Sequence, residues 1–242
     1  MSGSLAAAAS RFSSNLLPAS VVDRRALIAL NAARAAGRAI VRAVAGGEEK
    51  LIDPHSDASP LGVAAAEAAR ADISGPVEIE GRSWFLTVYN PPLDLVLIGA
   101  VHIAQPLAAM AALAGYGVRV IDPRTAFATQ ERFPGAVIVQ DWPDAVLAAQ
   151  PLGPRSALVA LAHDPKIDDP GLAAALSSPC FYIGALGSKK SHAARMARLK
   201  AQGFGDDDLA RIHGPVGLAI GARSPAEIAI AILAEMTQQL RT

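Results

Sequence analysis

The second part of the chain alternates short apolar runs with stretches of helical periodicity. The apolar runs are rich in aliphatic and β-branched side chains and cover residues 93–98, 117–121, 137–139, 157–161 and 181–183. Runs of this length, separated by helices, are typical of a parallel sheet that carries helices on both faces. The pattern therefore predicts an α/β domain built on a buried parallel sheet.

The first 90 residues show a different pattern, with short strands paired as hairpins. Helical periodicity covers residues 23–38 and 60–71, and two hairpins are predicted, residues 38–44 with 50–52 across Gly46-Gly47 and residues 77–79 with 84–89 around Gly81-Arg82. Two prolines after Asn90 can neither continue a helix nor donate to a sheet, so they mark a boundary. We expect a small amino-terminal α+β domain over residues 1–90 and the parallel-sheet domain over residues 91–242.

The two ends of the chain differ in predicted structure. Residues 1 to about 20 carry no basic segment and only a short apolar run, which predicts frayed chain rather than a targeting peptide. Residues 225–240 form a predicted helix with one apolar face. Ser224, Pro225 and Glu227 form a capping box with proline at the first helical position, which marks the start of this last helix.

Composition narrows the class of protein. The 242 residues include 22 basic and 22 acidic side chains, so no net field favours nucleic acid or an acidic membrane surface. Residues 95–118 lack charged side chains, but their glycines, Pro106 and a switch from strand to helix pattern predict a buried strand, turn and helix instead of a membrane span. The single cysteine, Cys180, excludes an internal disulfide, favours a cytoplasmic location and is expected in the sheet interior.

Polar side chains follow four of the predicted strands directly. His102 follows the first strand after Gly99, Asp122 and Arg124 follow the second, His163 and Asp164 follow the fourth, and a segment from Gly184 through Gly187, Ser188, Lys189 and Lys190 follows the fifth. In an open parallel sheet the carboxyl ends of the strands share one edge, where ligands bind. Ordinary turn and cap chemistry explains each segment singly. It explains the four together poorly, so we expect a binding site at this edge.

The first of these turns resembles a dinucleotide-binding fingerprint. Gly99, Val101 and Ala104 occupy the three glycine positions of G-x-G-x-x-G, and Asp122 lies where a ribose-binding carboxylate belongs. The turn predicts a Rossmann-like architecture. Val101 places a branched side chain where a pyrophosphate would approach the backbone, so we expect no tight NAD(P) site.

Two further features suggest contacts for an anion. His102 is expected at the amino end of the first helix, where the helix dipole favours the neutral imidazole. The segment from Gly184 to Lys190 opens a helix with two lysines, which is a candidate phosphate site, although an exposed helix start explains it equally. The segment lacks the spacing of an ATP-cleaving P-loop.

Metal and nucleophile chemistry find little support. His102, His163, His192 and His213 lie in the second domain, but no H-E-x-x-H or H-x-H spacing links them to a catalytic metal. No G-x-S-x-G nucleophile motif is present. We therefore expect neither a metal site nor a catalytic nucleophile.

With these segments identified, residues 91–242 resemble the XdhC/CoxI family. The resemblance rests on LIGAVHIA at 97–104, TAFAT at 125–129, ERFP at 131–134, AHDPKIDDP at 162–170, FYIGALGSKKSH at 181–192 and RIHGPVGLAIGARSPAEIA at 211–229. LIDP at 51–54 and RSWFLTVYNPP at 82–92 extend it to the front of some members. The glycine-rich segment ending in cysteine that many members carry is missing here.

The resemblance implies an accessory factor for molybdenum hydroxylases such as xanthine or carbon monoxide dehydrogenase. Such proteins bind molybdenum cofactor as cargo, in its molybdopterin or nucleotide form, support its sulfuration by a cysteine desulfurase, and deliver it to the apoenzyme. The cofactor-binding residues would be those of the sheet edge: Gly99, His102, Asp122, Arg124, His163, Asp164, Gly184, Gly187, Ser188, Lys189, Lys190, His192 and His213.

The sequence thus leads to a cytoplasmic maturation chaperone that needs no bond-making residue. Nucleic acid and membrane are not expected as partners, and the resemblance leaves room for a homodimer. Two alternatives from other classes stay open: an NAD(P)-dependent oxidoreductase with an altered fingerprint, and a small-molecule sensor without transferable cargo.

Overall fold

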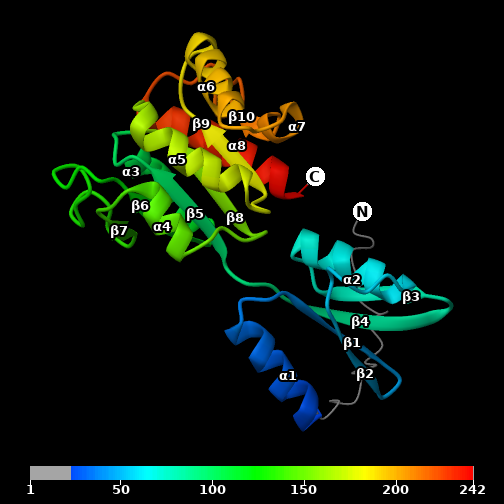
Figure 1. Cartoon of the computed structure of the whole chain (residues 1–242). Helices are drawn as coiled ribbons and strands as arrows, with labels where there is room; N and C mark the ends of the chain where they lie inside the picture. The colour runs from blue at the N-terminus through cyan, green and yellow to red at the C-terminus, as the bar shows by residue number, and fades with distance from the viewer. Residues whose placement is uncertain (1–22, 242) are drawn as a thin grey trace, which may run out of the picture. The chain divides into compact units, whose positions relative to one another are not determined.

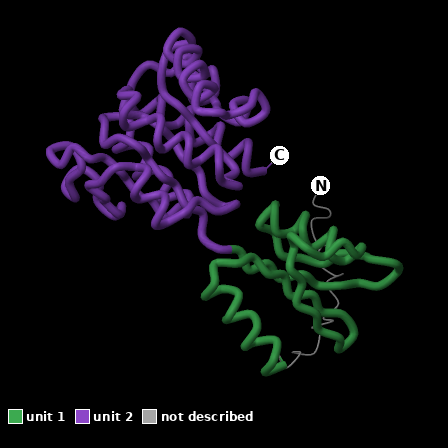
Figure 2. The backbone as a smooth tube through the Cα atoms, in the orientation of Figure 1, with its two compact units in different colours: residues 1–90 green, residues 91–242 purple. Residues whose placement is uncertain are grey.

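The chain divides into two compact units, residues 1–90 and 91–242 (Figure 2). The computed structural model describes residues 23–241. The expectation for residues 1 to about 20 therefore lies outside the described residues.

The smaller unit packs helices against an antiparallel sheet of four strands. Its strands pair in the order β2-β1-β4-β3. The elements are α1 (Arg24–Ala35), β1 (Ile40–Ala45), β2 (Glu48–Ile52), α2 (Pro60–Ala71), β3 (Gly75–Ile79) and β4 (Arg82–Tyr89) (Figure 1). Leu61 and Ala65 of α2 pack against Val41, Trp84 and Leu86 of the sheet. The predicted small α+β unit is confirmed.

The two hairpin turns of this unit have the same backbone geometry. Gly46 and Gly47 have φ of 53° and 84°, and Glu80 and Gly81 have φ of 52° and 76°. Two successive residues with positive φ match the right-handed twist of the flanking strands. The predicted turn around Gly81-Arg82 was therefore one residue too late, because Arg82 already pairs with Ile79 in the ladder.

The larger unit is a six-stranded parallel sheet with helices on both faces. Its strands follow the order β10-β9-β8-β5-β6-β7. The elements are β5 (Leu93–Ile98), α3 (Ala104–Leu113), β6 (Tyr116–Ile121), β7 (Val137–Val139), α4 (Pro143–Ala149), β8 (Ser156–Ala160), α5 (Pro165–Leu176), β9 (Tyr182–Ala185), α6 (Lys189–Ala201), α7 (Asp206–Leu209), β10 (Ile212–His213) and α8 (Pro225–Arg241) (Figure 1). The Rossmann-like fold predicted from the strand rhythm is confirmed.

Alternate residues of the central strands feed two separate cores. Leu95 and Leu97 of β5 pack with α3 and α8 on one face, through side chains such as Leu107 and Ile232. Val96 and Ile98 join the other core with α4, α5 and α6. A strand buried on both faces needs an unbroken apolar run, which is the pattern that predicted it.

Four details correct, complete or confirm the sequence prediction. β9 extends to Ala185, so Gly184 lies inside a strand. β10 was missed, because two residues are too few to show a period. Cys180 is buried as predicted, but it precedes β9 and does not lie within the sheet. The capping box of α8 is confirmed, since the amide of Ser224 donates to Glu227 and that of Glu227 to Ser224.

Residues 95–118 form a strand, a helix and the start of the next strand, as the sequence predicted. Over residues 23–241, none of the helices has the length and hydropathy needed to cross a membrane.

Candidate functional site

The strand order reverses between β5 and β8. From β5 the chain moves outward to β6 and β7, and then returns to add β8, β9 and β10 on the other side. At such a switch point the turns that leave the two central strands diverge, and ligands bind beside them. The turns after β5 and β8 are therefore the centre of the candidate site.

The backbone of the turn after β5 packs directly against the backbone of the turn after β8. Gly99 has φ of 101°, and a Cβ atom on it would lie 2.7 Å from the backbone nitrogen of Ala162. Only glycine fits this position. His102 lies exposed in the turn, before α3 begins at Ala104, so its imidazole faces solvent near the helix start and does not belong to the helix.

Asp122 is fully buried at the end of β6, where it holds two turns together. One carboxylate oxygen accepts hydrogen bonds from the amide of Ala100 and from Nη2 of Arg124, both at 2.8 Å. The other accepts from the amide of Arg124 at 2.9 Å and from its Nε at 2.8 Å. Burial alone would raise the pKa of Asp122, but these bonds outweigh it and hold the pKa below its ordinary value. Asp122 thus positions Arg124, whose guanidinium is partly exposed over the ring of Phe127.

The turn after β8 carries His163 on a strained backbone. His163 is exposed and has φ of 60°, which an L-residue rarely adopts. The amides of Ala162 and His163 each donate to Asp168 at 3.0 Å. Asp164 caps α5 by accepting from the amide of Lys166 at 2.9 Å. The carboxylate of Asp168 therefore holds the backbone of Ala162 and His163 in this turn.

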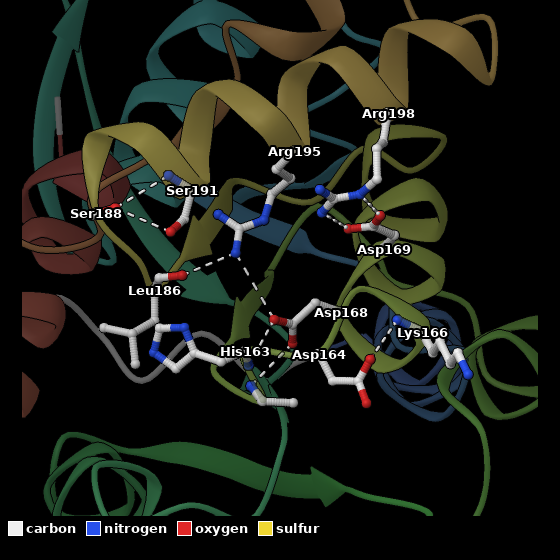
Figure 3. Close-up of polar contacts among 11 residues, drawn as sticks. His163, Asp164, Lys166, Asp168, Asp169, Leu186, Ser188, Ser191, Arg195 and Arg198 are labelled. Carbon is white, nitrogen blue, oxygen red and sulfur yellow. Dashed lines mark hydrogen bonds and ion pairs between the residues drawn. The ribbon is translucent and has the colours of Figure 1, made fainter.

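Asp168 also connects this turn to the turn after β9 (Figure 3). Asp168 is 2% exposed, and burial raises its pKa to about 6. Nη2 of Arg195 lies 3.9 Å from Asp168 and donates to the carbonyl oxygen of Leu186 at 2.9 Å. A buried carboxylate and a buried guanidinium thus hold two edge turns in register.

The turn after β9 presents the amino end of α6. Ser188 caps the helix, since its Oγ accepts from the amide of Ser191 at 3.1 Å (Figure 3). Lys189 and Lys190 are exposed in the first helical turn. Gly184 was expected in this turn but lies within β9, where a Cβ atom would clash with Val216 and Tyr182. Its role is close packing, and the turn itself starts at Leu186.

His192 and His213 lie at the β10 end of the same sheet edge. The ring of His213 stacks on Tyr182, and its Nδ1 lies 3.4 Å from Glu235. The Tyr182 hydroxyl donates to the same carboxylate. His192 is half-buried against Gly214, and burial and the charge of Arg195 lower its pKa.

The predicted residues therefore lie in a row along one edge of the sheet and do not surround a single point. Direct contacts connect the turns after β6, β5, β8 and β9, while His192 and His213 lie beyond the last of them. Among residues 23–241, no three His, Cys, Asp or Glu side chains gather in an arrangement that could hold a metal ion. Asp168, Arg195, Tyr182 and Glu235 were missed, because no local motif pairs side chains from separate elements.

The smaller unit also has an open cavity of about 380 Å³, lined by Lys50, Asp57, Ser59, Arg82 and Trp84 among others. None of the sheet-edge residues lines it.

The sequence matches a family model and several known proteins. The family model described as the XdhC Rossmann domain matches residues 95–236. "Uncharacterized protein YqeB" of Escherichia coli K12 is 31% identical over 72% of this chain and 31% of its own length. A protein of Bacillus subtilis described as a probable xanthine dehydrogenase subunit is 35% identical over 64% and 45%, respectively. The E. coli "Molybdenum cofactor insertion chaperone PaoD" is 30% identical over 61% and 40%.

A solved structure supports the same relationship. The crystal structure of a protein described as a xanthine dehydrogenase from Bacillus halodurans superposes with a TM-score of 0.65 at 26% identity, and the match covers 91% of this chain and 65% of that one. The chain spans less than half the length of the curated relatives it matches. Because the family model covers more than half of the chain and ends within α8, and because the fold is the one it describes, the chain belongs to the XdhC family.

Proposed function

We propose that this protein is a maturation chaperone that holds molybdenum cofactor at the carboxyl edge of the six-stranded sheet and releases it to a molybdenum hydroxylase. The observation that carries the proposal is the line of edge turns locked by Asp122 and Asp168, which leaves His102, His163 and Lys189 exposed on a fixed base. Kinship with PaoD, which is described as a molybdenum cofactor insertion chaperone, supports the choice of cargo.

The chemistry of the edge suits binding better than catalysis. Arg124, Lys189 and Lys190 supply positive charge for a phosphate, while the imidazoles of His102 and His163 supply hydrogen-bonding groups for the polar edge of a pterin. Holding and transferring a cargo needs no covalent step by the protein. Asp122 and Asp168, whose oxygens are bonded within the protein, act by positioning these groups.

Sulfuration of the cargo, if this chain supports it, would use sulfur brought by a cysteine desulfurase partner. Cys180 is buried, and burial raises the pKa of its thiol. A thiol in that state is neither ionised at neutral pH nor accessible to a sulfur donor. The proposed partners are therefore the hydroxylase apoenzyme and a desulfurase, and the proposal allows the chaperone to act as a homodimer.

A nicotinamide-dependent oxidoreductase remains the alternative, because the strand order is that of dinucleotide-binding domains. The hydrogen bonds of Asp122 argue against dinucleotide binding in the standard pose. Its oxygens already accept from Ala100 and Arg124, so a ribose hydroxyl would have to displace a bond to Arg124.

Two measurements test the proposal. Native mass spectrometry of the protein co-produced with a molybdenum hydroxylase should show molybdopterin bound to it, and a protein free of cofactor after such co-production would contradict it. Replacing Lys189 and Lys190 together by Ala should weaken molybdopterin binding at least tenfold, because charge-assisted contacts are lost. Lys200→Ala is the matched control, since Lys200 lies at the other end of α6 and pairs with Asp206.

A further inference from the structure

Arg195 is a buried cation whose hydrogen-bonding capacity is only partly used. The residue is 4% exposed, and its Nη2 donates to the carbonyl oxygen of Leu186. Its Nε and Nη1 are buried and have no acceptor within hydrogen-bond distance among the described residues. Leaving such buried donors unpaired destabilises the folded state, and more so when the group is charged. Arg195 is therefore unlike an ordinary structural arginine.

The carboxylates around Arg195 do not complete its bonding. Asp168 lies 3.9 Å away, too far for a hydrogen bond, and its oxygens accept from Ala162 and His163. Asp169 is bound by Arg198 through two bonds, Nε at 2.6 Å and Nη2 at 3.0 Å. One turn further along α6, the same helix thus makes a complete bidentate pair (Figure 3). Of these two arginines, only Arg195 has buried donors without an acceptor.

The free side of Arg195 faces the turn after β9. Figure 3 shows its guanidinium between Asp168 and the Ser188–Ser191 turn. A Cβ atom on Gly187 would lie 3.9 Å from both Nη1 and Nη2 of Arg195 and 3.2 Å from Cβ of Ser191. A side chain at position 187 would therefore lie against the guanidinium, and glycine leaves the space above it without one.

The same space is bordered by the amino end of a helix of 13 residues. The amides of Lys189 and Lys190 are in the first turn of α6, where backbone N–H groups have no carbonyl partner within the helix. The amide of Ser191 is already satisfied by Ser188. Free amides, the helix dipole and a buried guanidinium thus converge on one small volume.

We infer that Arg195 is the buried cation of a phosphate site formed by Gly187 and the first turn of α6. The inference rests on the proposed function and adds to it the residue that would anchor the cargo's phosphate. A dianionic tetrahedral phosphate accepts from the guanidinium and from the helix amides at once, whereas a planar carboxylate has only two oxygens for donors that diverge. Phosphate monoesters are therefore the expected ligand class, and free phosphate shares their chemistry.

Calorimetric titration of the full chain with inorganic phosphate and with molybdopterin tests the site. Arg195→Met should weaken both affinities at least tenfold, and Arg195→Lys, which keeps the charge but loses the planar fork, should weaken them by a smaller factor. Arg198→Lys, on the same helix, should leave both within twofold. Equal affinities for wild type and Arg195→Met would overturn the inference.

A second measurement follows phosphate binding in the wild-type protein, with Arg195→Lys used only to assign the signal, and covers the case in which Arg195→Met fails to fold. In a ¹H–¹⁵N spectrum, the Nε–H signal of Arg195, identified by its loss in Arg195→Lys, should shift as inorganic phosphate is added. The corresponding signal of Arg198 should stay in place. An Arg195 signal that does not move at saturating phosphate overturns the site.

The two ligands separate this inference from the proposed function. If phosphate binds through Arg195 but molybdopterin does not bind to the wild type, the site stands and the chaperone proposal fails. If molybdopterin binds equally well to wild type and Arg195→Met, the chaperone proposal stands and the role of Arg195 is wrong.

Discussion

Gly99 lies where the turn after β5 meets the backbone of the turn after β8, and two separate constraints act on it. Its φ of 101° is costly for any L-residue, and a Cβ atom would lie 2.7 Å from a backbone nitrogen. The fingerprint explains glycine here by the tight turn alone. The structure adds the contact with Ala162, which ties the two central turns together.

Gly99→Ala should therefore destabilise the larger unit by about 2–5 kcal/mol, the sum of about 1–2 for a left-handed backbone and about 1–3 for overpacking. Gly115→Ala is the matched control, because Gly115 has φ of 89° with open space around its Cα. It should cost only the backbone part. Urea denaturation of both variants measures the difference in their unfolding free energies. Equal losses of stability would show that the backbone around Ala162 can move to accommodate the added Cβ atom.

The raised pKa of Asp168 predicts how the stability of the protein depends on pH. Its folded pKa of about 6 lies above the ordinary value of 3.8, so the native state binds the proton more tightly than the unfolded chain. The stability contributed by the protonated form is complete below about pH 4 and is lost as the pH rises through about 6. Raising the pKa from 3.8 to about 6 corresponds to about 3 kcal/mol.

Asp168→Asn should remove this part of the pH dependence. The amide cannot accept from both Ala162 and His163, so the variant loses stability at every pH, and the readout is the slope rather than the level. Between pH 4 and 7 the unfolding free energy of the wild type should fall by about 3 kcal/mol relative to the variant. Parallel curves would mean that Asp168 is ionised throughout that range.

At the scale of elements, the central strands β5, β8 and β9 could be predicted because they are buried on both faces and are therefore almost entirely apolar. β10 could not, because its position beside β9 is set by the chain that returns from α7 and not by its own two residues. Gly184 shows the same limit. Within β9 its reason is the packing of Val216 and Tyr182, and no local sequence pattern contains that information.

Only those parts of the candidate site that lie within a single turn could be predicted from the sequence. Adjacent polar residues after each strand located the edge, since parallel strands end on the same side. The locking pairs could not be found, because Asp168 and Arg195 belong to different helices and meet only through the sheet order. Asp122 was found by its position, although its oxygens turn out to bind protein amides and Arg124.

The turn after β5 is the element that decides between cargo chaperone and dinucleotide enzyme. Val101 occupies the fingerprint position where a pyrophosphate needs bare backbone. Calorimetry with NADH should give a dissociation constant weaker than about a micromolar, which corresponds to less than about 8 kcal/mol of binding free energy. A tighter constant would favour the oxidoreductase.

Val101→Gly provides the companion test. Removing the branched side chain should strengthen NADH binding if the rest of the turn can accept a pyrophosphate, because backbone N–H groups become accessible. Gly115→Ala, in the turn after α3, controls for general loosening of the unit. Unchanged binding in Val101→Gly would show that bonds such as those of Asp122 already exclude the dinucleotide.

At the scale of the whole molecule, the chain carries two independent sets of core residues. The larger unit has a core on each face of its sheet, and the smaller unit has its own core between α2 and four strands. A unit with its own core can fold alone. Thermal unfolding of the full chain should therefore show two transitions, which a two-state description does not fit.

Residues 91–242 expressed alone should consequently unfold in one cooperative transition and bind molybdopterin with the affinity of the full chain. The reason is that every proposed contact, from Gly99 to His213, and both positioning carboxylates lie within that unit. Calorimetry of the two proteins side by side makes the comparison. If the fragment folds cooperatively but binds at least tenfold more weakly, residues 1–90 contribute directly to cargo binding, and the cavity beside Trp84 becomes the first place to introduce substitutions in the smaller unit.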